Sequence, residues 1–424
     1  MLYILFKTFY KKKGYLQTQI MRKLYHLIVL VLIVCAGFWF WNSSYRTQLT
    51  DYFQDTESFT QGIQQLFSKD NQIAEIVKEE QLVQVDTNTA FYYNQLSAEE
   101  QMVYQEILTG INQRQNRIGV EALSNEALSN VLEYVLNDHP EFFWLSGNST
   151  IWSNQSDTRK DIELEYTIAI DQIDGIKAEI DSIIDHYMAS WSSEAGEYDK
   201  VKAVYDYVIL NTDYNLQAEN NQNIQSVFLT QQSVCAGYAK AIQYMLQKAG
   251  VFCTYVSGTI NSSGEYHAWN LVSINGAYYY VDATWGDPTF LQNEASEDNK
   301  DTISYDYLCF TTSELLRTHT PKLPQILPDC ASNEYDYYRL HGWFYSEYIE
   351  SAIVETLSND VENGVSESYL KFTTAESYSE AYTRLFTDNV VYIPAKIKAE
   401  QTGSDTYGCT YWSNEEFYII KILW

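Results

Sequence analysis

Residues 233–250 have the sequence SVCAGYAKAIQYMLQKAG, and this stretch decides the fold. Apolar side chains recur in it at the spacing of an amphipathic helix, at Tyr238, Ala241, Ile242, Met245, Leu246 and Ala249. Gly250 is a natural end for this helix, which we place at 235–249. The helix therefore begins with Cys235. Two interpretations are open at this point: a small core cysteine, or a nucleophile at a helix N-terminus.

After this helix the apolar pattern changes to the alternation that is typical of strands. We expect three strands, at 251–259, 267–274 and 277–284. Asn275-Gly276 joins the last two, and this pair is the strongest short signal for a type I′ hairpin turn.

The hairpin brings a histidine and an aspartate together. Because a two-residue turn fixes which residues face each other, Trp269 should lie opposite Asp282, and His267 opposite Thr284. His267 and Asp282 are then diagonal neighbours on one face of the sheet, with Cβ atoms roughly 7 Å apart. That separation permits a hydrogen bond between the imidazole and the carboxylate.

A cysteine, a histidine and an aspartate in this arrangement match the roles of a nucleophile, a base and an orienting acid. A helix N-terminus and a nearby imidazolium both favour the reactive thiolate of Cys235. Asp287 is the rival of Asp282 for the orienting role. It follows Trp285-Gly286 and precedes a proline, so we expect it to cap a turn instead.

At this point the chain resembles the transglutaminase-like superfamily. Three segments carry the resemblance: SVCAGYAKA at 233–241, EYHAWN at 265–270 and YYVDATWGDP at 279–288. The segment AVYDYVILNTDYN at 203–215 is similar to the helix that precedes the family's core. Three motifs in order at close spacing are specific, whereas one alone is weak. Beyond about 190–290 the resemblance is looser and is closest to exported Gram-positive bacterial members.

The resemblance implies an α+β fold with a papain-like core, in which a helix carrying the cysteine packs on an antiparallel sheet. Cys235 would be the nucleophile, His267 the base and Asp282 the third member of a triad. The implied reaction is acyl transfer. The thiolate attacks a glutamine or peptide amide of a protein or peptide substrate, and a lysine amine or water resolves the thioester. It implies no cofactor and no metal.

Two alternatives stay open. A cysteine protease uses the same triad, and the sequence does not reveal whether an amine or water captures the thioester. The second alternative is a non-catalytic surface adhesion or scaffold protein that keeps this fold without its activity.

Aromatic residues flank the predicted triad. Trp269, Trp285 and Tyr266 are candidate substrate-binding residues, although ordinary packing explains the two tryptophans equally well. The backbone N–H of Cys235 is a candidate oxyanion donor, with a second donor from Gln232 or Tyr266. Four further histidines, at 139, 186, 319 and 341, have no second residue at metal-ligand spacing.

The charge distribution suggests a membrane-anchored protein. The formal net charge is −29, which argues against a nucleic-acid partner, yet residues 1–41 hold six Lys or Arg and no Asp or Glu. Residues 24–41 are uncharged and long enough to span a bilayer as a helix. We expect a single-pass anchor with the acidic bulk outside the cell. A cleaved signal peptide is the alternative.

Changes in composition and the positions of prolines divide the chain into six parts. They are a cytoplasmic tail at 1–23, the anchor at 24–41, a stalk at 42–89, a helical or mixed region at 90–185, the catalytic core at 186–330 and a small α+β unit at 331–424. In the last unit we expect strands near 337–345, 368–373, 389–397 and 416–423, and helices near 346–360 and 375–386. Cys309 and Cys330 either pair or remain reduced, because spacing alone does not decide.

Overall fold

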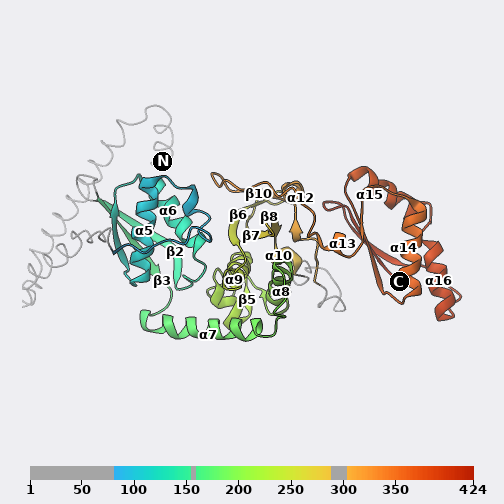
Figure 1. Ribbon diagram of the computed structural model, residues 1–424, viewed down its shortest axis with the longest axis horizontal. Coiled ribbons are helices and arrows are strands. Elements are labelled where there is room, and N and C mark those ends of the chain that lie inside the picture. Colours follow the sequence, from blue (N-terminus) through green and yellow to red (C-terminus); the bar gives the residue numbers. More distant parts are fainter. Residues whose placement is uncertain (1–80, 154–158, 288–302) are drawn as a thin grey trace, which may run out of the picture. The chain divides into compact units, whose positions relative to one another are not determined.

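The computed structural model describes residues 81–153, 159–287 and 303–424 (Figure 1). In these ranges helices and strands are mixed, as the predicted α+β class requires. The predicted anchor at 24–41 and most of the predicted stalk lie outside the described residues. Among the helices that are described, none has both the length and the apolar character needed to cross a bilayer.

The first part of the described chain is a small sheet with two helices. Its strands are antiparallel in the order β1-β3-β2, and the helices α5 and α6 begin at the capping serines Ser97 and Ser124. The element bounds are η2 Tyr93–Gln95, α5 Ala98–Asn112, β1 Arg117–Glu121, α6 Asn125–Asp138, β2 Leu145–Ser153 and β3 Arg159–Tyr166. The two helices agree with the sequence pattern, while β1 was not predicted.

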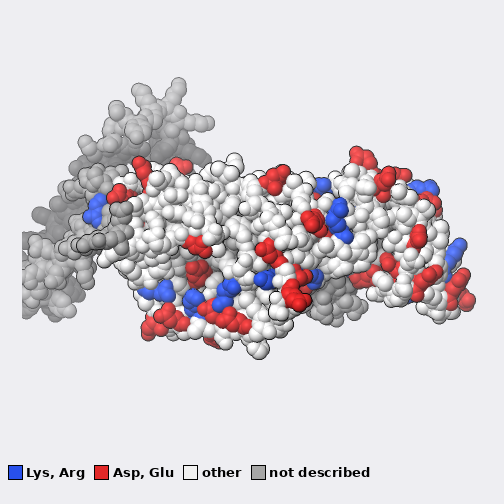
Figure 2. Space-filling view, viewed as in Figure 1, with Lys and Arg blue, Asp and Glu red and all other residues white. Residues whose placement is uncertain are grey.

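The chain then forms two long helices and the segment that leads to the cysteine helix. These elements are α7 Ile170–Met188, α8 Glu197–Leu210, β4 Asp213–Tyr214, η3 Ser226–Thr230, β5 Gln232–Ser233 and α9 Cys235–Lys248. Along α7, at the lower edge of the view in Figure 2, acidic and basic side chains lie close together. The Lys177–Asp181 ion pair at 2.7 Å is one example. Asp181 also accepts hydrogen bonds from Tyr244 and Lys248 of α9, so this pair joins α7 to the cysteine helix.

A five-stranded antiparallel sheet lies against α9, with the order β10-β6-β7-β8-β9. Its elements, with the two short helices that follow strands, are β6 Cys253–Ile260, β7 Tyr266–Ile274, β8 Ala277–Val281, α10 Ala283–Gly286, β9 Leu308–Phe310, α12 Thr312–Thr318 and β10 His319–Pro321. Buried apolar side chains of α9, β6, β7 and β8 form one continuous core. The predicted packing of the cysteine helix on an antiparallel sheet is confirmed.

The predicted hairpin register is confirmed as far as the ladder extends. The predicted strand 277–284 is too long, because β8 ends at Val281 and Asp282 caps the helix α10, so the expected pairs of Trp269 with Asp282 and of His267 with Thr284 are not part of the ladder. Ile274 pairs with Ala277, and Asn270 pairs with Val281, as a two-residue turn requires. Asn275 and Gly276 both have positive φ, at 50° and 82°, which is the backbone of a type I′ turn.

The last part of the chain is a four-stranded sheet of order β11-β12-β14-β13 with helices. Its bounds are α13 Tyr337–Leu340, β11 Phe344–Tyr345, α14 Glu350–Glu362, β12 Glu367–Phe372, α15 Ala375–Tyr382, η5 Thr383–Thr387, α16 Tyr392–Thr402, β13 Thr410–Asn414 and β14 Ile419–Leu423. Two predictions for this unit were wrong. The segment 389–397 enters helix α16, and 337–345 is helix α13 followed by the short β11.

Local chemistry explains the error at α16. The β-branched residues before it favour a strand on propensity alone. Pro394 lies in the first turn of α16, where a missing N–H costs no hydrogen bond, and Gly403 ends the helix with φ 67°. Val390 and Val391 are instead buried in the core of this unit.

Five cysteines lie in the described residues, and all of them are free thiols. Cys309 and Cys330 are therefore not paired with each other. Burial raises the pKa of both thiols, that of Cys330 to about 12. These two cysteines, like Cys253, are core residues.

Candidate active site

Cys235 is the first residue of α9 and is partly exposed. The residue before it, Val234, has an extended backbone and provides no side-chain cap. Ser233 anchors the approach to the helix, because its Oγ donates to the Asn221 carbonyl at 2.9 Å. A Cβ on Gly237 would lie 1.9 Å from that same Oγ, so only glycine fits there. The start of the helix, and with it the thiol, is held in place.

His267 lies near the start of β7 and is 6% exposed. Across the sheet it pairs with Gly258 of β6. A Cβ on Gly258 would lie 2.2 Å from the Thr320 carbonyl oxygen of β10, so this glycine permits β10 to approach closely. The sheet therefore fixes the imidazole from two sides.

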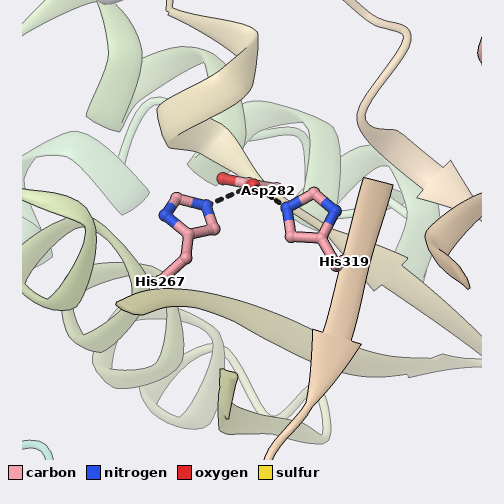
Figure 3. A group of neighbouring side chains, drawn as sticks. All are labelled: His267, Asp282 and His319. Carbon is pink, nitrogen blue, oxygen red and sulfur yellow. Dashed lines mark hydrogen bonds and ion pairs between the residues drawn. The ribbon is translucent and has the colours of Figure 1, made fainter. Parts of the chain in front are cut away.

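Asp282 leaves the end of β8 and caps the short helix α10. Its Oδ1 accepts from the backbone N–H groups of Thr284 and Trp285, at 3.0 and 3.2 Å. Its Oδ2 lies 2.7 Å from Nε2 of His267 (Figure 3). One oxygen is thus used to orient the carboxylate and the other to orient the imidazole.

The buried pair stays ionised. Burial opposes the charge on His267, but the Asp282 carboxylate and a hydrogen bond with the Cys235 thiol outweigh it and raise the pKa of His267 to about 10. Burial likewise opposes the charge on Asp282, but the two neighbouring imidazoles hold the pKa of its carboxyl well below its usual range. Because Nε2 of His267 is bound to Asp282, Nδ1 is the nitrogen left for the thiol.

The structure thus brings together the three residues that were predicted to form a triad. Cys235 comes from the start of a helix, His267 from β7 and Asp282 from the end of β8. Asp287, the rival of Asp282, is also buried, but its Oδ2 accepts a hydrogen bond from Tyr238 Oη at 2.7 Å.

His319 is a neighbour of the site that the sequence did not reveal. It is fully buried in β10, and its Nε2 lies 3.3 Å from Oδ2 of Asp282 (Figure 3). This contact is less well aligned than that of His267, because Nε2 makes no hydrogen bond of good geometry. Nδ1 lies 2.6 Å from Thr318 Oγ1. The sequence has no second residue at metal-ligand spacing from His319; its neighbours at the site come from distant strands, since β10 pairs with β6 in the sheet.

His267, Asp282 and His319 are also residue types that bind metals, with ligand atoms within 4.8 Å of one another. Two ligands of one tetrahedral zinc ion, each about 2.0–2.1 Å from it, lie roughly 3.3 Å apart. The 2.7 Å between Nε2 of His267 and Oδ2 of Asp282 is shorter and fits a shared proton. As it stands, the arrangement is that of an ion pair.

Only one of the three predicted substrate-binding aromatics lines the cavity at the site. Tyr266 is 89% exposed and lines it. Trp269 is buried, and its ring centroid lies 4.9 Å from that of His319. Trp285 similarly packs 5.0 Å from His319. Both tryptophans pack around the imidazoles, away from the cavity lining.

Tyr214 is a neighbour of the predicted oxyanion donor. The phenol of Tyr214 lies close enough to the Cys235 backbone N–H to affect its own ionisation, although burial is the larger influence and raises the pKa of Tyr214 to about 12. Tyr214 lines the same cavity as the thiol, and no motif in the sequence singles it out. Gln232, named as a second donor, uses its Oε1 to accept from Asn215 Nδ2 at 3.0 Å.

Cys235 and His267 open into a cavity of about 860 Å³. Its walls come from α6 and β2 on one side and from α9, β6 and β10 on the other, with Leu132, Tyr214, Ala236, Tyr255 and Pro321 among the lining residues. A cavity of this size at the thiol can accommodate several residues of a peptide.

Residues 186–283 match the Transglutaminase-like superfamily, Transglut_core, and this segment contains Cys235, His267 and Asp282. The family resemblance predicted from the motifs is therefore confirmed for this segment. The chain is also 30% identical over 122 residues to Kyphoscoliosis peptidase of Mus musculus and of Homo sapiens. That match takes in 23% of this chain and only 18% of each relative.

Two solved structures are similar to parts of the chain. A structure described as a TGase is 18% identical, with a TM-score of 0.25, and the match covers 43% of this chain and 54% of that one. The periplasmic domain of TgpA from Pseudomonas aeruginosa is 16% identical, with a TM-score of 0.21, over 31% of this chain and 56% of that one.

Proposed function

We propose that this protein is a thiol enzyme that acts on amide bonds of proteins or peptides through a Cys235 thioester. The observation that carries the proposal is the imidazole of His267, which lies between the Cys235 thiol and Oδ2 of Asp282. This is the arrangement of nucleophile, base and orienting acid. The cavity that opens at the thiol gives an amide access to it.

The geometry supports the following steps. The Cys235 thiolate attacks the carbonyl carbon of the amide, forming a C–S bond. The C–N bond then breaks as Nδ1 of His267 gives its proton to the leaving nitrogen. An amine or water next attacks the thioester, Nδ1 takes up its proton, and the C–S bond breaks to restore the thiolate. Throughout, Asp282 holds the imidazole through Nε2.

The acyl donor and acceptor decide between two enzyme classes. A glutamine donor and a lysine acceptor would make the protein a transglutaminase, and a peptide donor with water would make it a cysteine protease. The proposal also includes attachment to the cell membrane through residues 24–41, with the catalytic core outside, where surface proteins or wall peptides are the substrates.

The test compares the full-length protein with its Cys235→Ala variant. Both are incubated with a glutamine-containing protein and a labelled primary amine, and mass spectrometry follows amine incorporation and backbone cleavage. Incorporation that disappears in Cys235→Ala supports a transglutaminase, and cleavage that disappears supports a protease.

A second measurement separates an idle site from an unsuitable substrate. Iodoacetamide should alkylate Cys235 faster than a model thiol at neutral pH, because His267 favours the thiolate. Alkylation no faster than that of the model thiol would indicate the non-catalytic alternative.

A further inference from the structure

Two lysines line the cavity at Cys235, and their surroundings differ. Lys322, after β10, is bound by both carboxylate oxygens of Glu133, at 2.6 and 2.7 Å. Lys240, on α9, has no ion pair or hydrogen bond with any carboxylate within residues 81–153, 159–287 and 303–424. Its Nζ lies 5.8 Å from the centroid of the Tyr255 ring, at the distance of a cation–π contact.

An ammonium group without a counter-ion is poorly accommodated in a partly enclosed site. Burial alone lowers the pKa of Lys240 to about 8, and no acidic group opposes this effect. Elsewhere the fold pairs its enclosed lysines with carboxylates, as in the Lys177–Asp181 and Lys202–Asp206 pairs. The site of Lys240 therefore has room for an anion that the described chain does not supply.

Lys240 also stands where two cavities meet. A smaller cavity of about 200 Å³ is lined by Lys240 together with Asn221, Gln222 and Asn223. Asn223 turns its Oδ1 to the Gln225 N–H at 2.9 Å, which leaves the amide NH₂ end as the part of the side chain able to bind an anion. Leu136 and Phe142 form an apolar part of the wall.

We propose that Lys240 binds a carboxylate of the substrate, either an acidic side chain or the free α-carboxyl of a peptide, while the reacting amide lies at Cys235. The inference rests on the proposed function and adds a substrate class to it: acidic peptides. A charge-assisted hydrogen bond to the Lys240 ammonium would bind the carboxylate, and the neighbouring amides would add neutral donors.

The test uses peptides that react once with the Cys235 thiol. In bromoacetyl-(Gly)n-Glu-amide the thiolate displaces bromide, and the glycine spacer sets how far the glutamate reaches. Each reagent is compared with its glutamine counterpart on the full-length protein, and mass spectrometry follows alkylation of Cys235. We expect the glutamate reagent to react about tenfold faster at one spacer length, as a charge-assisted contact permits.

Three variants complete the experiment. Lys240→Met should bring the glutamate-to-glutamine rate ratio close to one at every length, and Lys240→Arg should restore it. Lys248→Met, on the same helix but outside the cavity lining, removes an equal charge and should leave the ratio unchanged.

A ratio near one at all lengths in the unmodified protein, with Cys235 reacting readily, would overturn the carboxylate site alone. A ratio that survives Lys240→Met would overturn the role of Lys240. A thiol that fails to react faster than a model thiol with the glutamine reagents would instead count against the proposed function.

Discussion

Lys371 on β12 and Lys240 at the cavity carry the same charge in opposite settings. Lys371 is fully buried, and its Nζ lies 2.6 Å from Asp336 and 2.7 Å from Glu314. Burial opposes its charge, but the two carboxylates outweigh this and raise its pKa above the usual range. Among the residues that the structure describes, no carboxylate pairs with Lys240, and burial lowers its pKa to about 8.

The two aspartates Asp336 and Asp282 differ in the same way as the two lysines. Asp336 and Glu314 both pair with Lys371. Asp336 also caps α13, because it accepts a hydrogen bond from the Tyr338 N–H at 2.9 Å, so these contacts stabilise the fold. Asp282 also caps a helix, but its second oxygen contacts the imidazoles of His267 and His319. The buried charges of Lys371, Asp336 and Glu314 neutralise one another and stabilise the fold. At the site, by contrast, Asp282 is paired with imidazoles, and Lys240 makes no ion pair with a carboxylate of the described residues. Four substitutions test that distinction.

The largest effect is expected from Asp282→Asn. The asparagine Oδ1 can still cap α10, but the side chain no longer carries the charge that stabilises the His267 imidazolium. We expect kcat/KM to fall roughly 10³–10⁴-fold, as when a triad carboxylate is replaced by an amide. Thermal unfolding should show the variant folded.

The pH profile of the same variant gives a second check. A His267 pKa of about 10 means that the imidazolium is present through neutral pH and is lost as pH rises through 10, so the alkaline limb of kcat/KM should lie there. In Asp282→Asn this limb should move down toward the ordinary histidine pKa of about 6.5. A limb that stays near 10 would mean that another group holds the proton.

Lys371→Met should instead affect stability. Glu314 and Asp336 would keep their helix-capping contacts but lose the cation between them. We expect the free energy of unfolding to fall by about 3 kcal/mol, because a buried charge is left uncompensated. Denaturant unfolding measures this change, and kcat per mole of reactive thiol should stay as in the unmodified protein.

A matched triple variant tests the cause of that loss. Adding Asp336→Asn and Glu314→Gln to Lys371→Met removes the two uncompensated charges and should recover much of the stability. No recovery would show that packing of the lysine stem, and not charge, accounts for the loss.

His319→Phe should have a smaller effect on activity. Phenylalanine keeps a ring among Trp269 and Trp285 but removes the nitrogen beside Asp282. We expect kcat/KM to fall about fivefold, roughly 1 kcal/mol, since the lost contact is imperfectly aligned. The alkaline limb should stay near pH 10, because the bond between His267 and Asp282 remains; a limb that shifts as in Asp282→Asn would give His319 the larger electrostatic role.

The sequence predicted the local parts of this site and missed the distant ones. Helix periodicity placed Cys235 at a helix start, and the Asn275-Gly276 turn fixed the register that brings His267 toward Asp282. These are short-range constraints. His319 reaches Asp282 only because β10 pairs with β6 across the sheet, and no spacing in the sequence encodes that pairing.

The same limit applies to the rest of the fold. The helices α5, α6 and α8 follow their apolar periodicity, whereas the start of α16 was predicted as a strand because Val390 and Val391 before it and Ile393 within it have high β propensity. There the buried environment of Val390 and Val391 and the stop at Gly403 outweigh propensity. Lys240 was unremarkable in the sequence, since its lack of a partner is a property of the folded chain.

The smallest effect is expected from Asp287→Asn, which separates the two aspartates that follow β8. Asp287 accepts from Tyr238 Oη, and an asparagine Oδ1 can accept the same hydrogen bond. Because Oδ2 of Asp282 provides the 2.7 Å contact with Nε2 of His267, kcat/KM should change less than about twofold, within the range of a substitution that keeps the Tyr238 hydrogen bond. A pH profile identical to that of the unmodified protein would assign the electrostatic control of His267 to Asp282. A fall as large as that in Asp282→Asn would mean that the buried charge of Asp287 also stabilises the imidazolium through Tyr238, and the contrast between structural and catalytic carboxylates would then fail within the site itself.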